Sequence, residues 1–134
     1  MQDWKPVFDS CVNSGVHHAG TDVDEAELGR LSAARGFEFA LIDLRNVQDK
    51  AGFLGEVSKV LKFPSYFGMN WDALSDCLTD MSWKPAAGHV LLFAGFSMLQ
   101  EKAAADATVA VQILHAAADF WRQKGVPFYV VLCD

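Results

Sequence analysis

The stretch FEFALIDLRNVQDKAGFLGEVSKVLKFP, residues 37–64, joins two patterns that together indicate the fold class. Residues 37–44 form a mostly apolar run of strand length, which is typical of a strand covered on both faces in a parallel sheet. In the remainder, apolar residues recur at the spacing of an amphipathic helix, and Pro64 ends that helix. The apolar positions of the helix are Phe53, Leu54, Val57, Val60 and Leu61.

Upstream of this stretch the chain predicts one more strand and one more helix. Residues 15–19 are a short strand candidate. Residues 21–36 predict a helix, with Thr21 as its N-cap in a capping-box-like start and Gly36 as its C-terminal stop. Residues 1–14 show no usable period, and we expect them to form a loosely attached N-terminal arm.

Downstream, the same alternation continues to the C-terminus. Apolar runs at residues 89–95 and 126–133 predict two more buried strands, and helices are expected near 97–104 and 108–124 between them. Strands that alternate with helices of this length pair in parallel through right-handed crossovers. The sequence therefore predicts an α/β fold with a small parallel sheet of three to four strands packed with helices, forming a single domain over residues 15–134.

Composition and charge limit the class of protein. The chain has 134 residues, 51% of them hydrophobic, which suffices for one domain with its own core. Its three cysteines have no paired spacing, and neither a signal peptide nor a membrane-spanning run is visible, so we expect a cytoplasmic protein. The net charge of −6 disfavours direct nucleic-acid binding and favours cationic partners, although such acidity can also serve solubility alone.

The stretch FGMNWDALSDCLTD, residues 67–80, predicts a helix with an acidic face. Asn70 is a good N-cap, and Asp72, Asp76 and Asp80 follow one helical turn apart. On a helical wheel these acids share the polar side with Ser75 and Thr79, opposite the apolar stripe formed by Trp71, Leu74, Leu78 and Met81. Like charges at this spacing repel, and Asp80 would also oppose the helix dipole in the last turn. Two interpretations stay open: a solvated face, or a binding surface for a cationic partner.

Aromatic side chains flank the predicted helix on both sides. Tyr66 and Phe67 precede it, and Trp83 follows it. Because interface hot spots are often aromatic anchors around desolvated charges, we expect Tyr66 to contact a partner. Phe67 and Trp71 are expected to pack into the core instead.

The segment FPSYFGMNWDALSDCLTD, residues 63–80, resembles the signature of the barstar family, which are intracellular inhibitors of secreted microbial ribonucleases. The resemblance extends from about residue 37 to the C-terminus, so it implies a family core over residues 37–134 and leaves residues 15–36 as an additional strand and helix at a sheet edge. The matching positions are Pro64, Tyr66, Phe67, Gly68, Asn70, Asp72, Ala73, Leu74, Asp76, Cys77, Leu78 and Thr79.

The resemblance implies a protein inhibitor that inserts an acidic helix and its preceding loop into the cationic active site of a barnase-type ribonuclease. It implies Asp76 as the central anchor, facing the arginines and the catalytic histidine of the nuclease, and Asp72 as a second anionic contact. Thr79 would supply a hydroxyl contact and Tyr66 a stacking contact. The roles implied for Gly68 and Asn70 are to shape the loop.

Three positions depart from the pattern of the best-known member of the family. Ser75 and Asp80 stand where that member has tryptophan and glycine, and both are expected at the periphery of the partner contact. An acidic contact from the last helix would align near Phe120, with Asp119 only adjacent. The cognate nuclease is therefore expected to differ as well.

Two other kinds of function were weighed. A binding module could use the same acidic face for a basic protein that is not a nuclease. Asp72 and Asp76 could in principle ligate a metal or act as an acid/base pair, but hard cations need several oxygen ligands and glycosidase carboxylates face each other across a substrate. His17 and His18 point to opposite faces of a strand and cannot chelate one ion together. We therefore expect no metal, no cofactor, no membrane partner and no enzymatic activity, and we make no prediction of the oligomeric state.

Overall fold

The computed structural model, which describes residues 2–21 and 23–134, contains a four-stranded parallel sheet. Its strands lie in the order β1-β4-β3-β2, so β1 and β2 form the two edges. The strands are β1 (Gly15–Gly20), β2 (Phe37–Asp43), β3 (Gly88–Ala94) and β4 (Phe128–Cys133). The predicted α/β fold with a small parallel sheet is confirmed.

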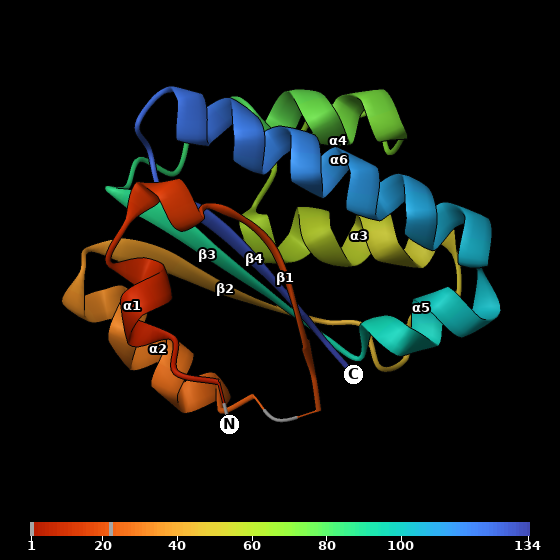
Figure 1. Cartoon of the computed structure of the whole chain (residues 1–134). Helices are drawn as coiled ribbons and strands as arrows, with labels where there is room; N and C mark the ends of the chain where they lie inside the picture. The colour runs from red at the N-terminus through yellow and green to blue at the C-terminus, as the bar shows by residue number, and fades with distance from the viewer. Residues whose placement is uncertain (1, 22) are drawn as a thin grey trace.

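Helices cover both faces of this sheet (Figure 1). On one face lie α3, α4, α5 and α6, and on the other lie α1 and α2. A short 3₁₀ helix spans Cys11–Asn13. The α-helices are α1 (Lys5–Phe8), α2 (Glu25–Ala34), α3 (Lys50–Leu61), α4 (Trp71–Leu78), α5 (Phe96–Lys102) and α6 (Ala104–Gln123).

The larger core lies between the sheet and helices α3 to α6. Alternate residues of the strands point into it, including Ile42 of β2, Leu91 and Phe93 of β3 and Val130 of β4, all of them buried. The helices contribute apolar side chains at helical spacing, as the sequence of α3 predicts. This layer carries α4, whose sequence is the acidic stretch.

The N-terminal segment packs against the other face of the sheet, where a loosely attached arm was expected. Trp4 and Phe8 are 4% and 2% exposed, with their ring centroids 5.9 Å apart. The ring of Phe8 lies 4.9 Å from that of Tyr129 on β4, whose hydroxyl donates a hydrogen bond of 2.8 Å to the carbonyl of Ser10. The expectation for residues 1–14 was wrong in this respect, because Trp4 and Phe8 are part of a core.

Helix α2 begins later than predicted and covers a face of the sheet, where it packs on β2 and β3. Its N-cap is Asp24, whose carboxylate accepts a hydrogen bond of 3.2 Å from the backbone N–H of Glu27. Thr21 is therefore not the cap, and the acid that was expected to complete the capping box serves as the cap itself. Leu28 of α2 is fully buried beside Trp4 and Phe8.

Among the residues that the structure describes, no helix combines the length and the apolar character needed to cross a membrane.

Candidate protein-binding surface

The acidic stretch forms α4, which begins where the sequence predicts. Asn70 has extended backbone angles, and its side-chain oxygen accepts a hydrogen bond of 2.7 Å from the backbone N–H of Ala73. Its side-chain nitrogen donates to the carbonyl of Gly68 at 3.3 Å. Asn70 is thus the N-cap of α4, and the same side chain ties the preceding loop to the helix.

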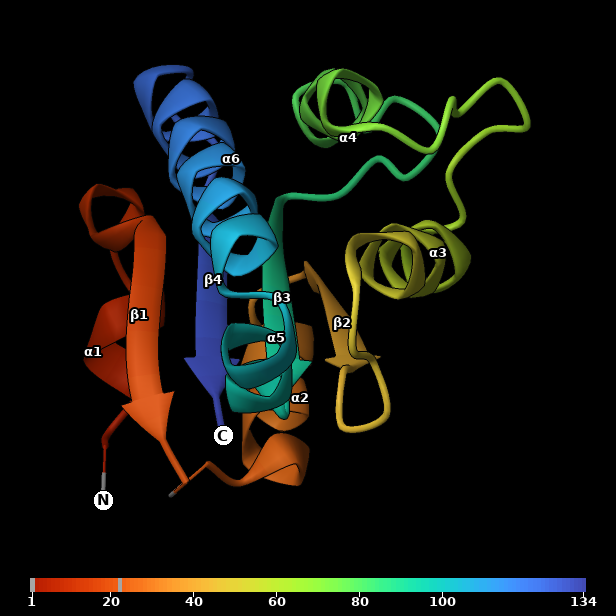
Figure 2. The same ribbon diagram turned by 90° about the vertical axis from the view of Figure 1, so that its right-hand side faces the viewer.

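The apolar side of α4 anchors it on the domain. Leu74, Cys77 and Leu78 are buried. The indole N–H of Trp121, near the end of α6, donates a hydrogen bond of 2.8 Å to the carbonyl of Leu78, one of the carbonyls that the last helical turn leaves without an internal partner. Figure 2 shows α4 beside the C-terminal part of α6, at the end of the sheet opposite to the arrowheads of the strands.

Helix α4 is shorter than the sequence predicts, and this changes the position of Asp80. The helix ends at Leu78 with Thr79 as its C-cap, and the backbone N–H of Asp80 bonds to the carbonyl of Cys77 at 3.2 Å in the turn that follows. Met81 then adopts a positive φ of 52° and is 3% exposed. The sequence predicts Asp80 in the last helical turn. In the structure Asp80 lies directly after that turn.

Asp72, Asp76 and Asp80 are all exposed to solvent, and we call their three carboxylates the acidic surface. No ion pair joins any of them to a lysine, arginine or histidine within the described parts of the chain. Neighbouring cations are engaged elsewhere: the ammonium of Lys50 lies 5.3 Å from the ring centroid of Trp71, and that of Lys84 bonds to Glu38 at 2.9 Å. The acidic surface is therefore charged and uncompensated within the described structure.

The residues beside the acidic surface differ in how much they can offer a partner. The hydroxyl of Thr79 donates a hydrogen bond of 2.9 Å to the carbonyl of Ser75, so its oxygen is left as an acceptor. Ser75 is partly exposed on the same helix. Burial raises the pKa of the Cys77 thiol, and the charges of Asp76 and Asp80 raise it further, which marks Cys77 as an unreactive packing residue.

The loop before α4, residues 63–70, holds two exposed large hydrophobic side chains, next to a cluster of packed aromatic rings. The ring of Phe67 is partly buried against Phe63, with centroids 4.9 Å apart, and Phe63 also meets Trp83 at 5.8 Å. In the same loop Tyr66 is 71% exposed. Partial desolvation raises the pKa of Tyr66, and the negative charge of Asp80 adds to that effect, so the phenol lies within the field of the acidic surface.

Core packing of Phe67 and Trp71, which the sequence predicts, is confirmed, because both pack against the larger core. Met69 is the second exposed large hydrophobic residue of the loop, and the sequence predicts no role for it. It is 46% exposed and has a left-handed φ of 53°. Nothing in the sequence marks this position, since the residues that usually adopt such a conformation are glycine and asparagine.

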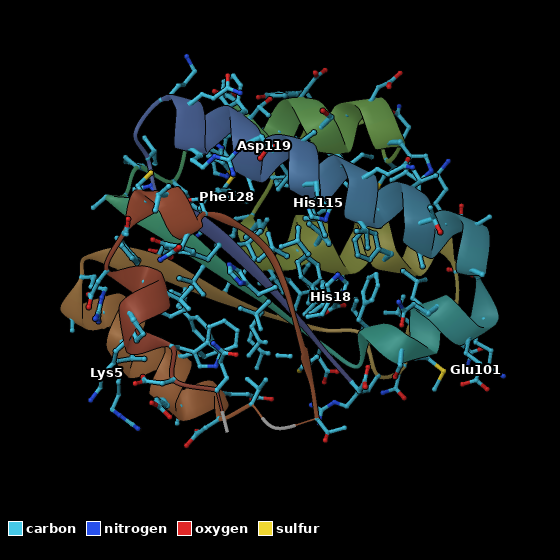
Figure 3. The ribbon with its side chains drawn as sticks, viewed as in Figure 1. Lys5, His18, Glu101, His115, Asp119 and Phe128 are labelled. Atoms are coloured by element: carbon cyan, nitrogen blue, oxygen red, sulfur yellow. The ribbon has the colours of Figure 1, made fainter. Side chains whose placement is uncertain are left out.

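The last helix adds no free acid to this surface. Asp119 on α6 (Figure 3) forms an ion pair of 2.8 Å with Arg122, one turn further along the same helix. Phe120, at the position where an acidic contact would align, lies 4.9 Å from the ammonium of Lys124. On α6, the aromatic ring of Phe120 therefore stands where an acid would align, and the neighbouring carboxylate of Asp119 is paired with Arg122.

Histidines and potential metal ligands lie apart from one another. His17 on β1 packs against Trp4, and its Nε2 lies 2.9 Å from the carbonyl of Asn13. His18 points to the opposite face, toward α6 (Figure 3), and lines a groove of about 390 Å³ with residues of α5 and α6. No group of three or more histidine, cysteine, aspartate or glutamate side chains gathers at one point in the described part of the chain.

Comparison with known protein families finds a match for most of the chain. A family model described as Barstar (barnase inhibitor) matches residues 37–133. The matched range contains β2, β3, β4 and the helices from α3 to α6, and therefore the whole acidic surface and its loop. No curated protein matches the chain.

Proposed function

The chain belongs to the barstar family, and from this premise we propose that it is a protein inhibitor which binds and blocks the cationic active site of a barnase-type ribonuclease. The proposal rests on one observation above all: α4 and the turn that follows it, both inside the matched range, carry three exposed carboxylates without a cationic partner in the described structure. The contact would be made by α4 and by the loop before it. We propose the cytoplasm as its compartment, since an inhibitor there protects a cell from its own nuclease.

Charge complementarity explains why such a surface fits a ribonuclease. A site that cleaves RNA must hold phosphate groups with arginine, lysine and histidine side chains. Carboxylates accept the same bidentate hydrogen bonds from arginine, so an acidic helix can occupy the positions of the phosphates. The repulsion between Asp72 and Asp76, one turn apart on α4, costs a few tenths of a kcal/mol in the free protein. It is offset in the complex by the attraction of both carboxylates to the cations of the pocket.

The position of each side chain suggests its role. Asp76 lies between Asp72 and Asp80 along the chain, on the exposed side of an anchored helix, and we assign it the central contact. Asp72 would be the second anionic contact, and the exposed phenol of Tyr66 would stack on a cationic or aromatic group of the nuclease. The assignment is of contact residues, and no catalytic role is proposed for any of them.

Smaller side chains complete the proposed contact. Thr79 would accept a hydrogen bond, because its own proton is already given to the carbonyl of Ser75. Gly68 and Asn70 would hold the shape of the loop through the hydrogen bond between them. We place Ser75 and Asp80 at the periphery, where they would tune which nuclease is bound.

Titration of the protein into a barnase-type ribonuclease, with RNA cleavage and calorimetry as readouts, tests the proposal. We expect inhibition that weakens as salt rises, because exposed charges are screened over about 10 Å at 0.1 M salt. Asp76→Asn should raise Kd by about thirty-fold or more, since losing one partner of a desolvated charge pair costs about 2–5 kcal/mol.

The matched control is Asp134→Asn, which removes the same charge from the exposed end of β4, at the opposite end of the sheet from α4. It should leave Kd within about twofold. Equal effects of the two substitutions would show that only net charge matters, and would contradict the assignment of Asp76.

A second candidate is a binding module that offers the same surface to a basic protein other than a nuclease. The observation in its favour is that the C-terminal part of α6, which lies beside α4, adds no unpaired carboxylate among the described residues, because Asp119 there is paired with Arg122. Affinity capture followed by an RNA-cleavage assay separates the two candidates. Recovery of a basic partner that lacks nuclease activity and is lost with Asp76→Asn would favour the second.

A further inference from the structure

Met69, in the loop before α4, breaks two local rules at once. Its φ of 53° lies in the left-handed region, which glycine or asparagine adopts at lower cost. Its side chain is also 46% exposed, although it is large and apolar. A sequence shaped for stability alone would carry glycine or asparagine here, so the methionine calls for another reason.

Packing inside the protein covers only part of the Met69 side chain. Its terminal methyl carbon lies 3.9 Å from the point where a side chain at Gly55 of α3 would begin, so one side of the methionine lies close to α3. Nearly half of the side chain remains in water. Residues with such conformations persist where the surrounding structure holds them, and they concentrate at binding sites.

The exposed apolar side chains of the described structure are not spread evenly. Val12, Tyr66 and Met69 are its exposed large hydrophobic residues, and two of these three lie in the loop that leads into α4. The loop is held by the hydrogen bond from Asn70 to Gly68 and by the packing of Phe67. Both apolar side chains are therefore presented from a fixed backbone, beside an uncompensated acidic surface.

We infer that Met69 is a specificity-determining contact, which places an apolar patch directly beside the anionic contacts of the same surface. The inference rests on the proposed function and deepens it: the partner is a basic protein whose cationic site is bordered by apolar surface where it meets this loop. Only two residues separate Met69 from Asp72, so the apolar and the anionic contacts fall on adjacent parts of the partner. Methionine suits this role because its flexible, polarizable side chain adapts to irregular surfaces and is enriched at interfaces.

Binding of three variants to a barnase-type ribonuclease, measured by calorimetry at two salt concentrations, tests the inference. Met69→Asn keeps the left-handed backbone favourable and removes the apolar contact, and it should raise Kd by about tenfold without changing the salt dependence. Met69→Leu keeps the apolar contact and should bind within about threefold of the wild type. Val12→Asn, which removes an even more exposed apolar side chain from the 3₁₀ helix before β1, outside this loop, should have no effect.

Thermal unfolding of the same variants tests whether weaker binding comes from the lost contact and not from a less stable protein. Met69→Asn should unfold at the same temperature as the wild type or higher, since asparagine tolerates the left-handed conformation. Wild-type affinity in Met69→Asn, together with loss of binding in Asp76→Asn, would overturn this inference and leave the proposed function standing. Failure of the wild type to bind the nuclease would overturn both.

Discussion

Replacement of Phe8 by alanine measures whether the N-terminal segment is an integral layer of the domain. Phe8 is 2% exposed and lies between the rings of Trp4 and Tyr129, at centroid distances of 5.9 and 4.9 Å. Both neighbours are held in place, because Trp4 is itself buried and the hydroxyl of Tyr129 is bonded to the carbonyl of Ser10. The space left by the ring therefore cannot close easily.

The expected loss follows from this packing. Truncating a buried phenylalanine to alanine costs about 3–5 kcal/mol, the sum of the lost transfer free energy and the remaining cavity. The upper part of this range applies where the walls of the cavity cannot collapse. Domains of this kind unfold with a free energy of about 5–15 kcal/mol in total, so Phe8→Ala should remove about a fifth of the stability or more.

Urea unfolding, followed by tryptophan fluorescence and circular dichroism, is the assay. The matched control is Val12→Ala in the same segment, where the side chain is 72% exposed and the change should stay within about 0.5 kcal/mol. Affinity for the proposed nuclease should be unchanged while Phe8→Ala remains folded, because Phe8 and α4 lie on opposite faces of the sheet. A loss below about 1 kcal/mol for Phe8→Ala would refute the reasoning and restore the picture of a loosely attached arm.

Two further predictions concern the cap of α4 and a buried histidine. Asn70→Ala removes the N-cap hydrogen bond and should lower the free energy of unfolding by about 1 kcal/mol, while Asn70→Asp, which keeps an acceptor, should lose less; urea unfolding measures both. His89 is 4% exposed, and its Nδ1 has no hydrogen-bond partner among the residues that the structure describes. Burial lowers its pKa, with Glu38 opposing and Lys84 adding to the shift. The unfolded chain binds this proton more readily, so the contribution of His89 to the free energy of unfolding should be complete above the ordinary histidine pKa of about 6.5 and should fall as the pH drops below it. His89→Gln should remove this part of the dependence of stability on pH. The same dependence in the wild type and in His89→Gln between about pH 7.5 and 5 would contradict the assignment.

Local chemistry is what the sequence predicted best. The N-cap at Asn70 and the division of α4 into an apolar side and an exposed side with Asp72 and Asp76 depend only on residues within one or two turns, and both are present. The end of α4 depends on distant contacts. No glycine or proline occurs in the six residues after Leu78, yet the helix stops there, where Trp121 from α6 bonds to the carbonyl of Leu78 and the chain turns through Met81.

The N-terminal segment shows the same limit more sharply. Trp4 and Phe8 lie one helical turn apart, but α1 has four residues, too few for any period to be recognised. Trp4 packs against Phe8, and Phe8 packs against Tyr129, which lies more than a hundred residues further along the chain. A sequence pattern within a short window cannot contain this information. The left-handed backbone of Met69 escaped prediction for a related reason, since the residue type gives no sign of it.

The apolar strands nevertheless indicate that helices cover both faces of the sheet. All seven residues of β3 and all six of β4 are buried, which requires cover on both faces of the sheet. The helices in the family-matched range, α3 to α6, pack on the face that carries the larger core. On the other face, Val90, Leu92, Tyr129 and Val131 would be left in water without Trp4, Phe8 and Leu28. We conclude that the segment before residue 37 covers this face of the sheet, while α4 and its exposed acids lie on the other face.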